Sequence, residues 1–252
     1  MPVMKFRRFA MALALAPLAL GLAACNKTEE STGGLSGAPI AKVAPPAGKS
    51  WNDVVTVTPE GGYRVGNPEA PLKLAEYAAL SCSHCAEFAE ASSADLRDNF
   101  IASGRVSYEL NFFMLNFLDV PATLLATCSA PEAVVPLSEQ FWGWQSEMFA
   151  KLQAAGQAQM EAAGNLPPEQ RFVAIAQLAG MDQFFASRGV ALPQGKACLA
   201  NTAKATQLVT ATEKAGKDLG ITGTPTLFLN GSKLSGNTWA VIKADLEKAG
   251  AR

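Results

Sequence analysis

The pattern of apolar and polar positions predicts a buried strand followed directly by a helix. The apolar run PLKLAEYAAL at residues 71–80 is short and is bounded by a proline and a Cys-X-X-Cys sequence, as is typical of a buried strand. Residues 82–103 then carry apolar side chains at roughly helical spacing, so a helix should begin near the first cysteine. The stretch RVSYELNFF at 105–113 alternates apolar and polar side chains, which indicates a second strand.

The middle of the chain differs in composition from both ends. Residues from about 119 to 219 are rich in Ala, Gln, Glu and Leu and are interrupted by SAPEA, GNLPPEQ and GVALPQG. Several helices fit this composition best. Strand signals return only in TPTLFLNGSKLSG, where Asn230-Gly231 predicts a hairpin turn, and a last helix should follow over about 238–248. The predicted order is strand, helix, strand, a block of helices, hairpin and helix.

The amino-terminal residues have the features of an export signal. Three basic residues precede an apolar run that ends in small side chains, and this run is too short and too well punctuated for a membrane-spanning helix. The sequence Leu22-Ala23-Ala24-Cys25 resembles a bacterial lipobox, so we expect a signal peptide over residues 1–24 and lipidation of Cys25. An uncleaved anchor and an ordinary secretory signal are the alternatives.

Residues 25–50 are predicted to form a flexible tether. They are rich in Gly, Pro, Ser and Ala and have no apolar periodicity, so they cannot build a core. As a random coil this segment would span roughly 25 to 30 Å. Loss of the signal peptide removes three basic residues and no acidic ones, which changes the net charge from −1 to −4. No basic patch favours nucleic acid as a partner.

The single histidine of the chain lies between two cysteines, in the sequence Cys-Ser-His-Cys at residues 82–85. A c-type haem site needs its histidine directly after the second cysteine, where this chain has Ala86. A structural zinc site needs four ligands, so Cys128 and Cys198 would have to converge on this loop. An iron-sulfur cluster lacks clustered thiolates for the same reason. The pattern favours a redox pair and predicts neither a metal nor a cofactor.

A Cys-X-X-Cys that opens a helix after a strand suits thiol-disulfide exchange. The free N–H groups and the positive end of the helix dipole favour the thiolate of Cys82, and a protonated His84 would add a second positive charge. Both effects stabilise the reduced form, by about 30 mV for each unit by which the pKa falls below the ambient pH. An inert disulfide between Cys82 and Cys85 is the alternative, although so small a ring removes little entropy from the unfolded chain.

Two stretches together resemble the DsbA-like thiol-disulfide oxidoreductases of bacterial cell envelopes. They are EYAALSCSHCAEF at 76–88 and GITGTPTLFLNG at 220–231, and the resemblance extends over about residues 51–250. It implies an α/β thioredoxin fold, in which a central mixed β-sheet is flanked by helices, with an inserted all-helical domain. The implied parts are 51–118 and 220–252 for the thioredoxin-like domain and 119–219 for the helical insertion.

The resemblance also implies roles for individual residues. Cys82 would be the exposed nucleophile and Cys85 the buried resolving cysteine, and the two would form a disulfide in the oxidised state. Ser83, on the side that faces the substrate, and His84 would tune this pair. Glu76 matches the acidic residue beneath the active site of the family, where burial would raise its pKa and let it carry the proton of Cys85. A position on the outward face of the strand is the alternative for this glutamate.

The tripeptide Gly223-Thr224-Pro225 looks like the cis-proline loop of the family, which faces the cysteines across the fold. Thr224 would offer its backbone groups to an extended substrate segment, as a strand does, and Pro225 would be cis. An ordinary turn proline before a strand is the alternative. This chain departs from many members in having Ser-His between the cysteines and Thr before the proline. Because the family sets its potential at these positions, the direction of electron flow stays open.

The chain has five cysteines, and lipidation of Cys25 leaves an even number. Cys128 and Cys198 are predicted to form a second disulfide that flanks the helical insertion, with two separate buried thiols as the alternative. Such a bridge would stabilise the fold by roughly 4 kcal/mol. Four aromatic residues of the same block have helical spacing and are interpreted as a core stripe rather than a ligand platform. They are Phe141, Trp142, Trp144 and Phe149.

The leading hypothesis is a membrane-tethered dithiol oxidase that introduces disulfides into exported proteins with free thiols. A quinone-linked membrane partner would reoxidise it. A reductase or isomerase, supplied by a reducing partner, is the alternative within the same chemistry, and a non-catalytic lipoprotein that binds peptides or a metal is the alternative outside it. The expected location is the periplasm, with a lipid anchor in the outer membrane, because Asn26 stands where an Asp would retain a lipoprotein in the inner membrane.

Overall fold

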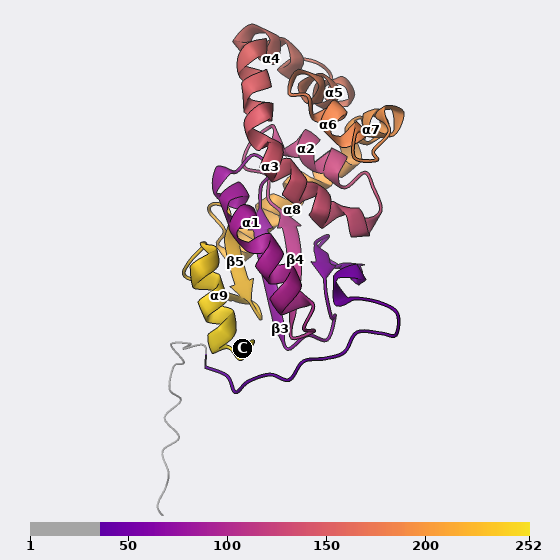
Figure 1. Ribbon diagram of the computed structural model, residues 1–252. Coiled ribbons are helices and arrows are strands. Elements are labelled where there is room, and N and C mark those ends of the chain that lie inside the picture. The colour runs from indigo at the N-terminus through magenta and orange to yellow at the C-terminus, as the bar shows by residue number, and fades with distance from the viewer. Residues whose placement is uncertain (1–35) are drawn as a thin grey trace, which may run out of the picture. The chain divides into compact units, whose positions relative to one another are not determined.

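The computed structural model describes residues 36–252, and a six-stranded sheet forms their centre (Figure 1). The strand order is β1-β2-β4-β3-β5-β6, in which β3 and β4 run parallel and the other neighbours are antiparallel. The parallel register places Ala78 opposite Phe112, so the carboxyl ends of β3 and β4 lie at the same edge of the sheet. The strands are β1 (Val55–Val57), β2 (Tyr63–Val65), β3 (Leu72–Ala78), β4 (Val106–Phe112), β5 (Thr226–Leu229) and β6 (Ser232–Lys233).

Most of the helices come from the middle of the chain, as its composition predicts. They are the 3₁₀ turn Trp51–Asp53, α1 (Ser83–Asp95), the π-helical turn Leu96–Ile101, α2 (Asp119–Ala126), α3 (Pro131–Ala155), α4 (Gln157–Gly164), α5 (Pro168–Leu178), α6 (Met181–Ala186), α7 (Leu192–Leu199), α8 (Thr202–Leu219) and α9 (Trp239–Lys248). The predicted strand at 71–80, the helix that begins at the first cysteine and the last helix are confirmed. The predicted hairpin turn is confirmed as well, since Asn230 and Gly231 both have positive φ, as a tight two-residue turn requires.

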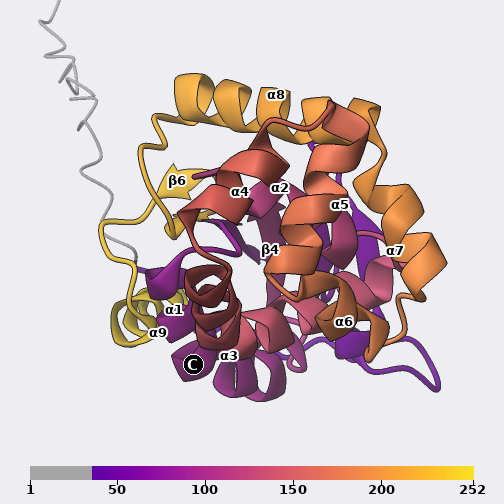
Figure 2. The ribbon, with the colours of Figure 1, turned by 90° about the horizontal axis from the view of Figure 1, so that it is seen from above.

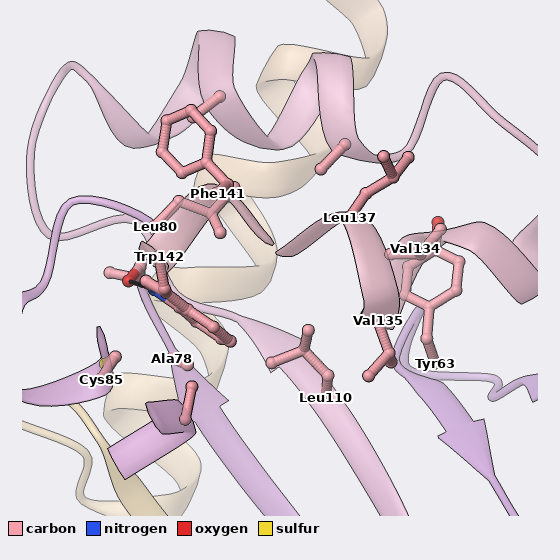
Figure 3. Packing of buried hydrophobic residues seen from close by; sticks show 14 of the residues in the cluster. Tyr63, Ala78, Leu80, Cys85, Leu110, Val134, Val135, Leu137, Phe141 and Trp142 are labelled. Carbon is pink, nitrogen blue, oxygen red and sulfur yellow. Dashed lines mark hydrogen bonds between the residues drawn. The ribbon is translucent and has the colours of Figure 1, made fainter. Parts of the chain in front are cut away.

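Helices cover both faces of the sheet. The helices α1, α3 and α9 lie on one side and α8 lies on the other (Figure 2). The side chains of β3 alternate accordingly, because successive residues of a strand point to opposite faces. Leu74 and Glu76 are buried on the α1 side, while Tyr77 packs on the α8 side against a small cluster that includes Phe228 and Ala215. Figure 3 shows the α1 side, where Val135 of α3 lies near Leu110.

Strand β4 is buried along almost its whole length, although its alternating pattern is that of a half-exposed strand. Its polar residues Ser107, Glu109 and Asn111 are buried together with its apolar ones. The Glu109 carboxylate is compensated by Arg64, 2.5 Å away, and accepts a hydrogen bond of 3.0 Å from the Thr58 hydroxyl. A central strand covered on both faces buries its polar side as well, and these partners make that burial affordable.

The helical block contains a disulfide and a group of stacked aromatic rings. Cys128 and Cys198 are joined by a disulfide with a Cα–Cα distance of 6.0 Å, which is the pairing favoured from the sequence. Of the predicted aromatic stripe, Phe141 and Trp142 are buried and Trp144 is half-buried. The prediction is wrong for Phe149, which is exposed to 41%.

The prediction of a flexible tether does not hold for residues 36–50, which we call the N-terminal strap. Its backbone N–H groups at Gly37 and Ile40 donate to Lys248 and Gly250 at the end of α9, at 2.8 and 2.9 Å. The Val43 N–H donates to the Ser103 carbonyl at 2.9 Å. Free carbonyls after a helix end are available for such bonds, and a composition-based argument overlooks them. The signal peptide, Cys25 and the rest of the predicted tether lie outside the described residues. Within residues 36–252, no helix combines the length and the apolar character needed to cross a membrane.

Candidate active site

The two cysteines of the Cys-X-X-Cys sequence stand at the junction of β3 and α1. Cys82 is the N-cap residue of α1 and has extended backbone angles, φ −82° and ψ 119°. Its Sγ accepts a hydrogen bond of 3.3 Å from the Cys85 backbone N–H. The sulfur therefore takes the place that a serine or aspartate oxygen usually has at a helix start, where an anion is favoured.

The surroundings of the two thiols push their pKa values in opposite directions. The pKa of Cys82 is lowered to about 6, first by a hydrogen bond with the Cys85 thiol and then by Thr224 and the backbone N–H groups of Cys85 and His84, although partial burial opposes this shift. Burial raises the pKa of Cys85 well above its ordinary value. Cys82 is 8% exposed and Cys85 is fully buried. The lowered pKa makes Cys82 mostly thiolate at neutral pH, while Cys85 is a protected thiol. Cys82 was expected to be exposed, but in this structure it is buried as well.

The structure contains the reduced form of this pair. Cys82 and Cys85 are free thiols, so the disulfide expected in the oxidised state is not formed here. The hydrogen bond from the Cys85 thiol to Cys82, the largest cause of the lowered pKa, exists only in this form. It is therefore a contribution that stabilises the dithiol and not the disulfide.

The predicted proline loop lies directly against the first cysteine. The Thr224–Pro225 peptide bond is cis, and the Cys82 sulfur lies 3.3 Å from the Thr224 carbonyl oxygen, across 142 positions of the sequence. Only the protonated form of Cys82 can donate a hydrogen bond to this oxygen. The Thr224 hydroxyl is buried without a hydrogen-bond partner among the described residues. The fold thus brings together the two stretches that carry the resemblance.

The expected interaction of His84 with Cys82 is weak, because the charge of Cys82 is the smallest of the causes that raise the pKa of the imidazole. Its side chain is 72% exposed, and its Nδ1 lies 3.0 Å from the Glu87 carboxylate, which raises the pKa of the imidazole. Its backbone N–H contributes to the lowered pKa of Cys82, whereas the ring is not among the causes of that shift. The one-turn spacing of His84 and Glu87 on α1 explains the difference, because it aligns their side chains with each other. Ser83 is exposed beside the two cysteines.

Glu76 is buried beneath the cysteines, on the α1 face of the sheet, with 1% of its surface exposed. Its Oε2 accepts a hydrogen bond of 2.7 Å from the Tyr108 hydroxyl, and its Oε1 has no partner among residues 36–252. Burial raises the pKa of Glu76 to about 8, and the charges of Cys82 and Glu139 act in the same direction, while Tyr108 opposes them. A buried carboxylic acid that holds its proton at neutral pH can donate it to a nearby thiolate.

Asp119 is an active-site residue that the sequence does not reveal. Its fully buried carboxylate accepts backbone hydrogen bonds from Ser81 at 2.8 Å and from Leu115 and Asn116 at 2.9 Å. It therefore joins the residue directly before Cys82 to the loop that leads into α2. An aspartate at a helix start is a common local signal, and nothing in it identifies the distant partner.

Two side chains of α3 also hold the active-site loop from the helical block. The Gln145 amide donates to the Leu80 carbonyl at 2.7 Å and to the Cys82 carbonyl at 3.1 Å. The Trp142 indole donates to the Ala79 carbonyl at 3.0 Å, and Figure 3 shows this ring close to Leu80. These bonds fix the backbone between β3 and α1, and they make the helical block part of the site. Within the described residues, no group of three or more His, Cys, Asp and Glu side chains is placed to hold a metal ion.

Comparison with known proteins identifies the family. The family model described as thioredoxin matches residues 58–248, so the chain belongs to the thioredoxin family. The structure is similar to the crystal structure of a protein-disulfide isomerase from Novosphingobium aromaticivorans, with a TM-score of 0.70 and 28% identity over 74% of this chain and 96% of that chain. It is also similar to Wolbachia pipientis alpha-DsbA1, with a TM-score of 0.61 and 19% identity over 80% of this chain and 96% of that chain.

A curated relative from Rickettsia conorii carries the name "Putative protein-disulfide oxidoreductase". It is 21% identical over 192 residues, which are 73% of this chain and 59% of that protein. The chain therefore spans about three-fifths of the length of this relative. The predicted resemblance to DsbA-like proteins and the predicted thioredoxin fold with added helices are confirmed by these matches.

Proposed function

We propose that this protein is a thiol-disulfide oxidoreductase that works as a dithiol oxidase of the cell envelope. The observation that carries the proposal is the difference in pKa and burial between its two cysteines. Cys82 has a pKa of about 6 and keeps 8% of its surface exposed, whereas Cys85 is fully buried with a raised pKa. Such a pair favours its own reduced form, and a pair that favours its reduced form oxidises other thiols.

The chemistry begins with the Cys82–Cys85 disulfide. A substrate thiolate attacks the Cys82 sulfur, so a mixed disulfide forms and Cys85 leaves as a thiolate. A second substrate thiolate then attacks the substrate sulfur of the mixed disulfide, which releases Cys82 as a thiolate. The substrate has lost two electrons and gained a disulfide, and the protein has gained the two electrons as a dithiol.

Glu76 is proposed as the proton donor to the leaving thiolate of Cys85. Cys85 is fully buried and its thiol has a raised pKa, so it cannot remain charged after it leaves the disulfide. Glu76 has a pKa of about 8, still holds its proton at neutral pH, and its charge acts directly on Cys85. A proton passed from this carboxyl to the sulfur would neutralise the buried charge.

Substrate recognition is assigned to the cis-proline loop. The Thr224 carbonyl already meets Cys82, so backbone groups of this loop are within reach of a substrate segment held at the sulfur. An extended segment would pair with Thr224, beside Pro225 and the exposed Ser83. Because the contacts are to backbone, they would suit many exported proteins with free thiols rather than one sequence.

The cellular setting is part of the same proposal. A lipid on Cys25 would anchor the protein in the cell envelope, with the outer membrane favoured by Asn26. A quinone-linked membrane protein would take the two electrons and restore the Cys82–Cys85 disulfide. No cofactor is needed for the exchange itself, because all electrons move between sulfur atoms.

The decisive measurement is the reduction potential of the Cys82–Cys85 pair against glutathione, on residues 26–252 with the Cys128–Cys198 disulfide intact. The pKa of Cys82, about 6, lies between about 7 for thioredoxin and about 3.5 for DsbA. We therefore expect a potential less negative than about −240 mV, between those two proteins. A more negative value would overturn the oxidase and favour a reductase.

An isomerase is the second candidate, and the moderate pKa of Cys82 favours it. A thiol with a pKa of about 6 is mostly thiolate at neutral pH, so the reduced protein can attack wrong disulfides. The Novosphingobium neighbour is named a protein-disulfide isomerase. Refolding assays separate the two functions, because an oxidase accelerates refolding of a reduced substrate and an isomerase accelerates refolding of a scrambled one.

A further inference from the structure

A cavity of about 760 Å³ lies on the face of the sheet opposite the two cysteines, between the strands and α8. We call it the rear cavity. Tyr77 and Asn111 line it from this face of the sheet, and residues of α8 form its helix side. Tyr63 and Phe112 also line it, although their side chains pack together on the α1 face. Glu76 and Tyr77 are adjacent on β3 and point to opposite faces, so Tyr77 lies across the sheet from the carboxyl group beneath the cysteines. The volume of the rear cavity is within the range of about 300 to 1,000 Å³ that is typical of small-molecule sites.

The floor of the rear cavity carries a polar group without a partner. Asn111 is only 6% exposed, and its Nδ2 makes no hydrogen bond within the described residues. A buried amide N–H that loses water without gaining an acceptor destabilises the folded state by about 1 to 3 kcal/mol. On the same face of β4, Glu109 has two partners, whereas the Ser107 hydroxyl also has none among the described residues but does not line the cavity. Such a group is satisfied when a ligand supplies the acceptor.

One wall of the rear cavity carries a cation without a partner. Lys204, in the first turn of α8, lines the cavity, is half-buried and has no carboxylate within salt-bridge distance among residues 36–252. Lys214 on the same helix lines the cavity too but forms an ion pair with Asp218. Glu60 also acts on Lys214, so that end of the cavity has an excess of negative charge. The free positive charge lies at the other end, about 15 Å away along the helix axis.

The rest of the lining is suited to an apolar body. The Tyr77 ring comes from this face of the sheet, and Leu208, Ala211 and Ala215 line the cavity from α8. The small alanines leave room beside the ring for the body of a ligand. A ligand that fits must therefore combine hydrocarbon with a single anionic group.

We propose that the rear cavity binds a small organic acid with an aromatic or alkyl body and one carboxylate. The carboxylate would accept hydrogen bonds from the Asn111 amide and the Lys204 ammonium, which satisfies both groups at once. The body would lie along the apolar wall toward the middle of α8. A dianion such as a phosphate ester fits less well, because Glu60 and Asp218 add negative charge and the described lining offers one free cation.

The test uses 4-phenylbutyrate as the probe and 4-phenylbutan-1-ol and 4-phenylbutylamine as its neutral and cationic controls. Binding to residues 26–252 is followed by NMR titration, with the Asn111 side-chain amide and the two tyrosine rings as reporters. We expect the acid to bind with a dissociation constant between about 10 µM and 1 mM. The alcohol should bind at least about tenfold more weakly, since it cannot replace the charge-assisted hydrogen bonds, and the amine should not bind.

Substitutions locate the site. Lys204→Gln should weaken binding of the acid about tenfold or more and leave binding of the alcohol unchanged, whereas Lys217→Gln, an exposed lysine of α8 outside the cavity lining, should change neither. Asn111→Leu should abolish binding, and its melting temperature is measured alongside. The proposal is overturned if the acid does not bind at 5 mM, as an order-of-magnitude limit, or binds no better than the alcohol. It is overturned equally if Lys204→Gln has no larger effect than Lys217→Gln.

Discussion

The two cysteine pairs of this protein are opposites. Cys82 and Cys85 are three positions apart in one helical turn and are free thiols, with one pKa lowered and the other raised. Cys128 and Cys198 are 70 positions apart and form a disulfide that joins the turn after α2 to α7. The first pair closes a ring too small to stabilise the fold, while the second closes a loop long enough to do so.

The difference shows what makes a cysteine pair reactive. The helix start, the cis-proline loop and the buried Glu76 all act on the first pair, and each changes the stability of a thiolate or a thiol. None of these groups contacts the second pair. Reactivity is therefore supplied by the surroundings of a pair, and sequence spacing alone determines only how much entropy a bridge removes.

The largest expected effect comes from Cys82→Ala. Loss of the nucleophile should reduce the rate of disulfide transfer to a reduced peptide by about 10³-fold or more. The double variant Cys128→Ala with Cys198→Ala is the matched control and should keep that rate within about twofold, because it leaves the active site intact. Residual oxidase activity of Cys82→Ala at more than a tenth of the starting rate would contradict the assignment.

The same double variant should show a large loss of stability. Removal of a bridge that closes about 70 residues costs about 4 kcal/mol in the free energy of unfolding, under the chain-entropy model. Urea denaturation of the parent and the double variant, both with Cys82 and Cys85 reduced, measures it. A loss below about 1 kcal/mol would show that the Cys128–Cys198 disulfide does not stabilise the fold as the chain-entropy model expects. A shift in the potential of the first pair would show that the two pairs are coupled.

Glu76→Gln should change the pH dependence of stability. The pKa of Glu76 is about 8 in the fold and 4.5 in its ordinary state, so the folded protein keeps this proton at pH values where the unfolded chain has lost it. Glu76 therefore costs the folded state least below about pH 4.5, and the free energy of unfolding falls as the pH rises from there to about 8. Gln keeps the shape and loses the titration, so it should raise the free energy of unfolding at pH 8 by a few kcal/mol.

The measurement for Glu76 is a set of urea denaturations between about pH 4.5 and pH 8. Glu90→Gln is the control, because Glu90 is an exposed carboxylate on α1 and should give curves parallel to those of the parent. Parallel curves for Glu76→Gln would show that Glu76 is ionised in the fold, and its proposed role as proton donor would then fail.

The smallest effect is expected from Glu87→Gln. His84 and Glu87 form an exposed pair, and exposed pairs contribute little because water screens them. The pKa of His84 should return toward its ordinary value, which NMR of the imidazole can follow. The pKa of Cys82, measured by thiolate absorbance, should change by less than about 0.3 unit. A larger change would show that the imidazole acts on the sulfur after all.

The local part of the site could be predicted from the sequence. A short apolar run, a Cys-X-X-Cys and helical periodicity are all signals within about one helical turn, so the β3–α1 junction follows from residues 71–103. The burial of Glu76 was indicated only by the resemblance to a known family, because the residues on both faces of β3 around it are largely apolar. The contact of Thr224 with Cys82 was available only through the resemblance to a known family.

The side chains that hold the active-site loop in place could not be predicted from the sequence, because each has a partner far away in the chain. Asp119 meets Ser81 across 38 positions, and Gln145 meets Cys82 across 63. An aspartate or a glutamine in a helical block has many possible partners, and periodicity does not select among them. The N-terminal strap was missed for a related reason, since a segment of low apolar content can still be held by backbone hydrogen bonds alone.

The N-terminal strap decides which way the molecule would face if it were held by its amino-terminal segment. The strap meets the body at Lys248, Gly250 and Ser103, at the end of the sheet where β4 begins. Cys82 follows the opposite end, because β3 and β4 run parallel and it comes after β3. The seven residues of β3 separate the two ends by about 23 Å. An attachment through the strap would therefore hold the protein at the end of the sheet opposite Cys82. The Cys82 sulfur would then face away from the attachment.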